Sequence, residues 1–167
     1  NCSNSVGLLV SELQGPFYGP MMSGIENTFR NQGKHLIIAA GHSDEEREKQ
    51  GIEFLISRNC DGLILHVEAV SDDYLIKLSK GRTPFVLINR YISELSDRCI
   101  LLNNIKGGYL AAKHVLEQGH KNIAYISGPL WKQDAKDRLE GHKQALAEFN
   151  LEFDENLLFQ GDFMEAS

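Results

Sequence analysis

Long apolar runs are missing from the sequence, since no window approaches the ~20 consecutive apolar residues that a membrane helix needs. The start of the chain, Asn1–Asn4, also lacks the basic residues and the apolar stretch of a signal peptide. We therefore expect no membrane partner. Because the first residue is not methionine, we also expect this chain to be part of a longer protein.

Cysteine is scarce, and the basic residues form no cluster. Cys2, Cys60 and Cys99 are odd in number and lack the spacing of metal ligands, so we expect free thiols in a reducing cytoplasm. The 17 Lys and Arg residues are outnumbered by 23 Asp and Glu residues, which gives a net charge of −6. Since affinity for nucleic acids comes largely from Lys and Arg neutralising phosphates, this chain alone should not bind DNA.

The motifs of common catalytic sites are absent as well. The sequence has no G-x-G-x-x-G fingerprint, no G-x-x-x-x-G-K-[ST] phosphate loop, no G-x-S-x-G serine turn and no H-E-x-x-H zinc pair. Its histidines are scattered along the chain. We therefore expect no enzymatic activity, no catalytic residues, no metal site and no cofactor.

The sequence does contain a regular alternation of short apolar runs with amphipathic segments of helical length. Most of the runs are continuous, which suits strands that are covered on both faces. The alternation predicts right-handed crossovers and an α/β fold with doubly wound parallel sheets. The predicted strands are 6–10, 36–40, 63–67, 85–88, 100–102 and 123–127, and the predicted helices are 18–32, 45–58, 72–80, 106–118 and 134–149.

The alternation breaks once, after the fourth strand. Tyr91–Arg98 is too short and irregular for a packed helix, yet it separates two predicted strands. We therefore predict that the chain passes here into a second lobe, with residues 1–102 in the N-terminal lobe and 103–167 in the first part of a C-terminal lobe. Two complete lobes need roughly 200–300 residues, so we expect the second lobe to be incomplete.

Local chemistry marks several helix ends. Gly33 and Gly119 stand where a chain that leaves a helix commonly turns left-handed. Ser43–Glu46 places a cap candidate and two acids at the start of the second helix, where a helix N-terminus favours negative charge. The charged run Asp44–Lys49 is expected to form a solvated face of that helix.

Ligands of open α/β sheets bind at the carboxyl ends of strands, and this rule selects a small set of residues. Planar polar groups pair with the vicinal hydroxyls of a sugar, and aromatic rings stack on its apolar face. A cleft between two lobes is a common place for such a ligand. The candidate ligand-binding residues are Phe17, Tyr18, His66, Asn89, Trp131, Asp134 and Arg138.

The aromatic candidates and the histidine also have structural interpretations. Phe17 and Tyr18 would equally pack the first helix against the sheet. A histidine at a strand end, such as His66, more often serves as a hydrogen-bonded structural residue. Trp131, the single tryptophan, stands in a loop and would equally serve an interface or the packing of a lobe.

The charged candidates differ in how specific their positions are. Arg138 falls in the first turn of a helix, where the helix dipole disfavours a cation, so we expect it to have a specific partner. Asp134 lies four residues earlier on the same face and would orient the guanidinium. Arg90 is expected to form an ion pair with a nearby acid, whereas Asn89 remains a candidate hydrogen-bond donor to a ligand.

Seven stretches of the sequence occur in the order and spacing of one known family: Val6–Val10, Pro16–Tyr18, Gly24–Glu26, Cys60–Leu65, Val86–Arg90, Gln118–Ile126 and Asp134–Gly141. Together, from Ser5 to Gly161, they resemble the sensor domain of the LacI/GalR bacterial transcription repressors. Leu87–Arg90, Arg98–Ile100 and Asp134–Leu139 are most similar to the galactose-repressor branch.

The resemblance implies a periplasmic-binding-protein-like fold, a homodimer with part of its contact on the first helix, and a helix-turn-helix headpiece that is absent from this chain. It also implies a small sugar or glycoside effector bound between the lobes, which changes the affinity of the headpieces for operator DNA. By position, the effector contacts would fall on all the candidates above except Trp131. Glu12, Gly15 and Tyr18 depart from the family pattern, which leaves the identity of the sugar open.

Two rival functions remain. An exported solute-binding protein of a sugar transporter would have the same fold and the same site, and a headpiece ahead of Asn1 would distinguish the two. A small flavodoxin-like enzyme would need a phosphate loop after the first strand. Gly15–Tyr18 stands there and is too bulky to let phosphate approach the backbone closely.

Overall fold

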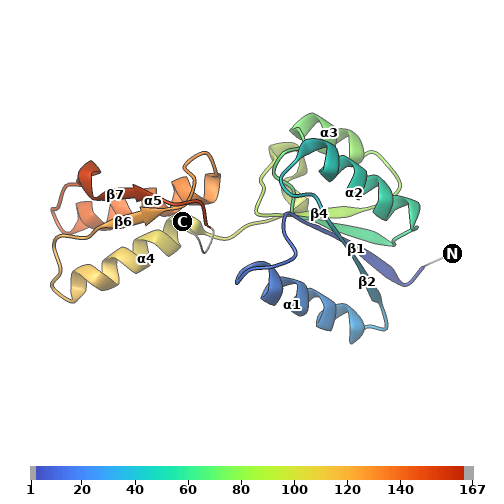
Figure 1. The fold of residues 1–167 in the computed structure, drawn as a ribbon, viewed down its shortest axis with the longest axis horizontal. Helices are drawn as coiled ribbons and strands as arrows, with labels where there is room; N and C mark the ends of the chain where they lie inside the picture. The colour runs from blue at the N-terminus through green and yellow to red at the C-terminus, as the bar shows by residue number, and fades with distance from the viewer. Residues whose placement is uncertain (1–2, 164–167) are drawn as a thin grey trace. The chain divides into compact units, whose positions relative to one another are not determined.

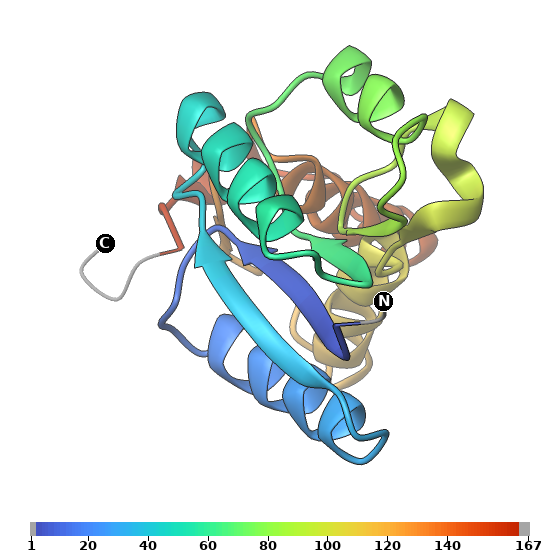
Figure 2. The same ribbon diagram turned by 90° about the vertical axis from the view of Figure 1, so that its right-hand side faces the viewer.

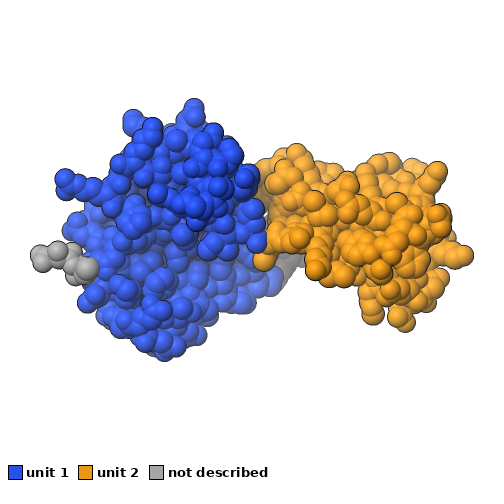
Figure 3. All heavy atoms as spheres, turned by 180° about the vertical axis from the view of Figure 1, so that it is seen from behind, with its two compact units in different colours: residues 1–101 blue, residues 102–167 orange. Residues whose placement is uncertain are grey.

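A computed structural model describes residues 3–163 of the chain (Figure 1). The chain divides between Leu101 and Leu102 into two compact units, coloured separately in Figure 3. We call them unit 1 and unit 2 and describe each by itself. No helix within the described residues is both long and apolar enough to cross a membrane.

Unit 1 is a five-stranded parallel sheet with the strand order β2-β1-β3-β4-β5. Figure 2 shows α1 on one face of this sheet and α2 and α3 on the other. The predicted doubly wound α/β architecture is therefore confirmed. The strands are β1 (Ser5–Val10), β2 (His35–Ala40), β3 (Gly62–Leu65), β4 (Phe85–Ile88) and β5 (Cys99–Ile100), and the helices are α1 (Tyr18–Arg30), α2 (Glu45–Ser57), α3 (Asp72–Leu78) and the 3-10 helix η1 (Ser93–Arg98).

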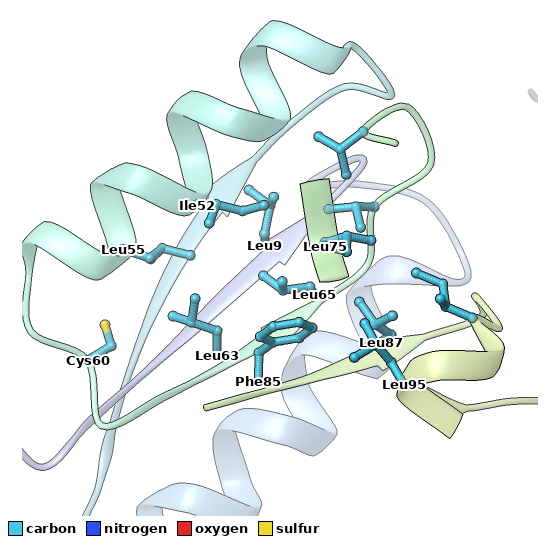
Figure 4. Close-up of a cluster of buried hydrophobic side chains, with 13 residues drawn as sticks. Leu9, Ile52, Leu55, Cys60, Leu63, Leu65, Leu75, Phe85, Leu87 and Leu95 are labelled. Carbon is cyan, nitrogen blue, oxygen red and sulfur yellow. The ribbon is translucent and has the colours of Figure 1, made fainter. Parts of the chain in front are cut away.

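The core of unit 1 lies between its sheet and the helices of one face (Figure 4). Leu65 and Leu87 project from neighbouring strands and are fully buried, as are Ile52 and Leu55 on α2. Ile52 and Leu55 stand three residues apart, so they share the buried stripe of the helix. Fully burying one such side chain stabilises the fold by roughly 1.5–3 kcal/mol. This packing holds the strands in place, and the strand ends with them.

The connection between β4 and β5 is the irregular segment that interrupts the predicted alternation. We predicted that the N-terminal lobe ends at residue 102, after the strand that follows this segment. The segment contains η1, whose Leu95 is buried in the core, and it returns the chain to the same sheet. Cys99 and Ile100 pair with Leu87 and Ile88 in parallel register, and the chain leaves the sheet only after β5.

Unit 2 contains α4 (Asn104–Glu117), β6 (Tyr125–Ser127), α5 (Gln133–Glu148), the 3-10 helix η2 (Glu155–Leu157) and β7 (Leu158–Gln160). The two strands pair in parallel, and β7 was not predicted. Helices α4 and α5 pack closely because Gly108 and Gly141 lie at their crossing. An added Cβ at Gly108 would stand 2.0 Å from the carbonyl oxygen of Arg138, and one at Gly141 would stand 1.9 Å from that of Ile105.

Several local predictions can be checked in the described residues. Gly33 and Gly119 have positive φ angles of 70° and 90°, as predicted for the residues that follow helices. Asp44 caps α2 by accepting a hydrogen bond from the backbone N–H of Arg47 at 2.9 Å. Cys60 and Cys99 are free thiols, and Cys2 lies outside the described residues.

The solvated face predicted for Asp44–Lys49 is wrong at one position. Glu48 is 0% exposed, and its carboxylate accepts hydrogen bonds from three backbone N–H groups of the segment 68–70. Those hydrogen bonds replace the water that a carboxylate loses on burial. One residue of a charged run on a helix is therefore buried when a neighbouring loop supplies hydrogen-bond donors to it.

Candidate functional site

The carboxyl ends of β1 and β3 bring a serine and a histidine together in unit 1. Ser11 follows β1 directly and His66 follows β3 directly, and β1 and β3 are neighbours in the sheet. The Ser11 hydroxyl lies 3.1 Å from Nδ1 of His66, and both side chains are buried. Because the hydroxyl is shielded from solvent, this pair supports the imidazole ring and is not placed as an exposed nucleophile.

Phe17 and Tyr18 complete an aromatic cluster around His66. The Phe17 and Tyr18 rings meet edge to face at 5.1 Å between centroids, and their centroids lie 6.0 and 5.5 Å from that of His66. Phe17 is 42% exposed, whereas His66 is buried. The structure thus brings three predicted residues together, with Phe17 as the ring most open to a ligand. Their binding role stays a prediction.

Asn89 and Arg90 follow β4, the next strand of the same sheet edge. Asn89 adopts a left-handed conformation with φ of 57°, and its backbone N–H donates to the carbonyl of Ile100 at 2.9 Å.

Nη2 of Arg90 donates to Asp72 at 2.7 Å, which confirms the predicted ion pair. Nη1 of Arg90 is buried and has no hydrogen-bond partner within the described residues. A buried donor of a charged group is costly to leave unpaired, so a ligand oxygen at this position would be favourable.

In unit 2, Arg138 is held by groups from two helices. Its Nη2 lies 3.4 Å from Oδ2 of Asp134, one turn earlier on α5, as the spacing predicted. Its Nε donates to Oδ1 of Asn104 at the start of α4, at 2.9 Å. The Arg138 side chain remains 38% exposed, which leaves room for a ligand to approach it. The close crossing of α4 and α5 brings Asn104 within reach of Arg138.

Phe163 is an aromatic neighbour of Arg138 that the sequence reasoning missed. Its ring centroid lies 5.9 Å from the guanidinium carbon, and the ring packs onto Gly128, where a Cβ would stand 1.8 Å from Cζ. Trp131, the predicted aromatic of this unit, is 65% exposed, and the ammonium of Lys132 lies 5.1 Å from its ring centroid. The structure therefore places Phe163 beside the candidate arginine and leaves Trp131 as an exposed loop residue.

Unit 2 also contains a groove of about 440 Å³ lined by α4, β6 and α5. Its walls are mainly apolar, and Arg138 and His142 line it from α5. The His142 ring is buried against Tyr125 and Phe153, with centroid distances of 4.7 and 5.9 Å. Burial lowers the pKa of His142, because a charged imidazolium loses its water there.

A strand-end search could have found both missed residues. Ser11 is the first residue after β1, and Phe163 follows β7 by three residues, so both obey the rule that selected the other candidates. Phe163 was missed because β7 is too short for an apolar pattern in the sequence to reveal it. Among the described residues, no group of three or more His, Cys, Asp and Glu side chains is placed to hold a metal ion.

Sequence comparisons match this chain to a known family and to transcriptional regulators. A family profile described as "Periplasmic binding proteins and sugar binding domain of LacI family" matches residues 3–163. The HTH-type transcriptional regulator GalR of Escherichia coli K12 is 36% identical over 160 residues, which cover 96% of this chain and 47% of GalR. The HTH-type transcriptional repressor PurR of Aliivibrio salmonicida is 32% identical over 164 residues, 98% of this chain and 49% of PurR. This chain spans about half the length of these curated relatives.

Solved structures show the same fold. A periplasmic binding protein/LacI transcriptional regulator from Alkaliphilus metalliredigens, solved with D-xylulofuranose, has a TM-score of 0.80 and 28% identity. The match covers 95% of this chain and 57% of that one. The predicted periplasmic-binding-protein-like fold and the predicted resemblance are both confirmed. The chain belongs to the family of periplasmic binding proteins and sugar-binding domains of the LacI family.

Proposed function

We propose that this chain is the effector-binding part of a cytoplasmic transcription repressor, and that its ligand is a small sugar or glycoside. The observation that carries the proposal is the guanidinium of Arg138, which Asp134 and Asn104 hold in place beside an aromatic ring, on a side chain that stays partly exposed. A planar guanidinium can donate to two vicinal hydroxyls at once, and a neighbouring ring suits the apolar face of a sugar.

Unit 1 offers a similar combination of groups. Phe17 presents an open ring beside His66, and Arg90 has one unpaired N–H group at the same edge of the sheet. We propose that Asn89, which also follows β4, donates to the same effector. The relative solved with D-xylulofuranose supports a sugar as the class of ligand, and the names of GalR and PurR support a regulatory role over transport or catalysis.

We propose a two-state mechanism in which the whole protein acts as a dimer with DNA-binding headpieces. An effector shifts an equilibrium between two states only through its different affinity for them. Linkage then requires that the effector changes DNA affinity by the same factor as DNA changes effector affinity. The acidic balance of this chain agrees with DNA contacts made elsewhere in the protein.

Calorimetric titration of the full-length protein with D-galactose and other neutral monosaccharides tests the proposal. We choose D-galactose first because three stretches of the sequence resemble the galactose-repressor branch. Arg138→Ala and Asn89→Ala should each weaken binding, and loss of one charged hydrogen bond costs roughly 1.5–3 kcal/mol, about ten- to a hundredfold in affinity. Lys136→Ala, an exposed cation on the same helix, is the control and should bind as the wild type does.

The outcome that contradicts the proposal is specific. If Arg138→Ala and Asn89→Ala both fold and both retain wild-type affinity, the proposed contacts are wrong and Arg138 is a structural ion pair. If the wild type binds none of the monosaccharides, the ligand class is wrong.

A further inference from the structure

Glu48 places a fully buried carboxylate against the segment that follows β3. The residue belongs to the first turn of α2 and is 0% exposed. Its Oε1 accepts a hydrogen bond from the backbone N–H of Glu68 at 2.8 Å, and its Oε2 accepts from Ala69 at 2.9 Å and Val70 at 2.8 Å. Three consecutive N–H groups therefore converge on one carboxylate, as successive backbone donors do in anion-binding nests.

The segment 68–70 connects two parts of the candidate site in unit 1. His66, which lies against Ser11 and the aromatic rings, precedes the segment by two residues. Asp72, which holds Arg90 at 2.7 Å, follows it by two residues. Because so few bonds separate the segment from either group, a displacement of its backbone moves both of them.

The ordering of this segment comes from another element of the fold. A buried carboxylate is unfavourable unless hydrogen bonds replace its water, and three backbone donors do so here. The hydroxyl of Ser43, in the loop ahead of α2, adds a second link by donating to the Glu68 carboxylate at 2.8 Å. Glu48 and Ser43 thus tie the segment after β3 to α2 and its preceding loop.

We propose that Glu48 is a positioning residue of the effector site, which fixes the segment 68–70 and thereby sets the geometry of His66 and of the Asp72–Arg90 pair. The proposal rests on the function proposed above for the strand-end groups of unit 1. Since Glu48 is buried, it acts through the segment and does not touch the effector.

The test compares Glu48→Gln with Glu53→Gln in the full-length protein, because Glu53 is an exposed carboxylate on the same helix. One readout needs no ligand. It combines the NMR signals of the His66 ring and the Arg90 Nε–H group with hydrogen exchange of the amides of 68–70. The other readout is calorimetric titration with D-galactose.

We expect Glu48→Gln to speed exchange of the segment amides, because the amide NH₂ group that replaces one carboxylate oxygen cannot accept their hydrogen bonds. The His66 and Arg90 signals should shift, and D-galactose should bind about tenfold more weakly, the scale of one lost charged hydrogen bond. Glu53→Gln should match the wild type in every readout.

In one outcome, the amides of 68–70 lose protection while the His66 and Arg90 signals and the D-galactose affinity stay at wild-type values. That result would show that Glu48 is purely structural and would overturn the proposal. If the wild type does not bind D-galactose, the ligand-free signals still decide whether Glu48 positions the two groups, so the two proposals fail separately. If Glu48→Gln does not fold, Glu48→Asp is read in the same way, since it keeps the charge but withdraws the carboxylate by one methylene.

Discussion

The crossing of α4 and α5 gives a sharp test of how unit 2 is built. In the Gly141→Ala variant, the new methyl carbon would stand 1.9 Å from the Ile105 carbonyl oxygen and 2.6 Å from the Tyr109 backbone nitrogen. Carbon and its non-bonded neighbours prefer separations of about 3.5 Å, so the helices must move apart by about 1.5 Å. Both neighbours are backbone atoms and cannot rotate away.

The size of the effect follows from two opposing contributions. Overpacking costs typically about 1–3 kcal/mol, whereas alanine in a helix gains about 1 kcal/mol over glycine. Because the contact at Gly141 is unusually short, we expect a net loss of about 2 kcal/mol in the free energy of unfolding. Gly107→Ala on α4 is the matched control, since nothing lies within 4 Å of its added Cβ. That variant should gain up to about 1 kcal/mol.

Urea unfolding followed by circular dichroism and by the fluorescence of Trp131, which lies in unit 2, measures both variants. Separation of the helices should also draw Asn104 away from Arg138, so Gly141→Ala should bind D-galactose more weakly than Gly107→Ala. Equal stability of the two variants would refute the reasoning, because it would show that α4 and α5 can separate without cost.

Two further predictions concern Arg138 and His142. Arg138→Lys should weaken D-galactose binding in calorimetry by about tenfold or more, because an ammonium cannot reproduce the planar fork that engages Asp134, Asn104 and a ligand together; wild-type affinity in this variant would show that charge alone suffices. Burial lowers the pKa of His142 below its ordinary value of 6.5, so the unfolded chain takes up a proton first as the pH falls. The contribution of His142 to the free energy of unfolding should therefore be at its full value above about pH 6.5 and decrease below it. In urea unfolding, the stability of His142→Leu should decrease less than that of the wild type as the pH falls. Equal pH dependence of the two proteins would contradict this.

The ends of most strands could be predicted from the sequence because continuous apolar runs mark strands that are buried on both faces. This reasoning brought Phe17, Tyr18 and His66 to one cluster, and the four-residue spacing brought Asp134 to Arg138. It also correctly predicted a parallel, doubly wound sheet and most of the helices. These features depend on local periodicity, which a single sequence carries in full.

The errors arose where long-range packing decides the outcome. Glu48 has the local pattern of a solvated residue, and only the donors of the segment 68–70 explain its burial. The short β7 is defined by its pairing with β6, not by its own composition, so Phe163 went unnoticed with it.

The groups that support the candidate site come from elements other than those that carry it. Ser11 supports His66 from a neighbouring strand, and Asn104 supports Arg138 from a neighbouring helix. In unit 2 this support depends on Gly141, which lets the helices approach closely enough for Asn104 to reach the guanidinium. We therefore expect affinity for an effector to depend partly on residues that never touch it, because each holds a proposed binding group in one geometry and reduces the entropy that binding must remove.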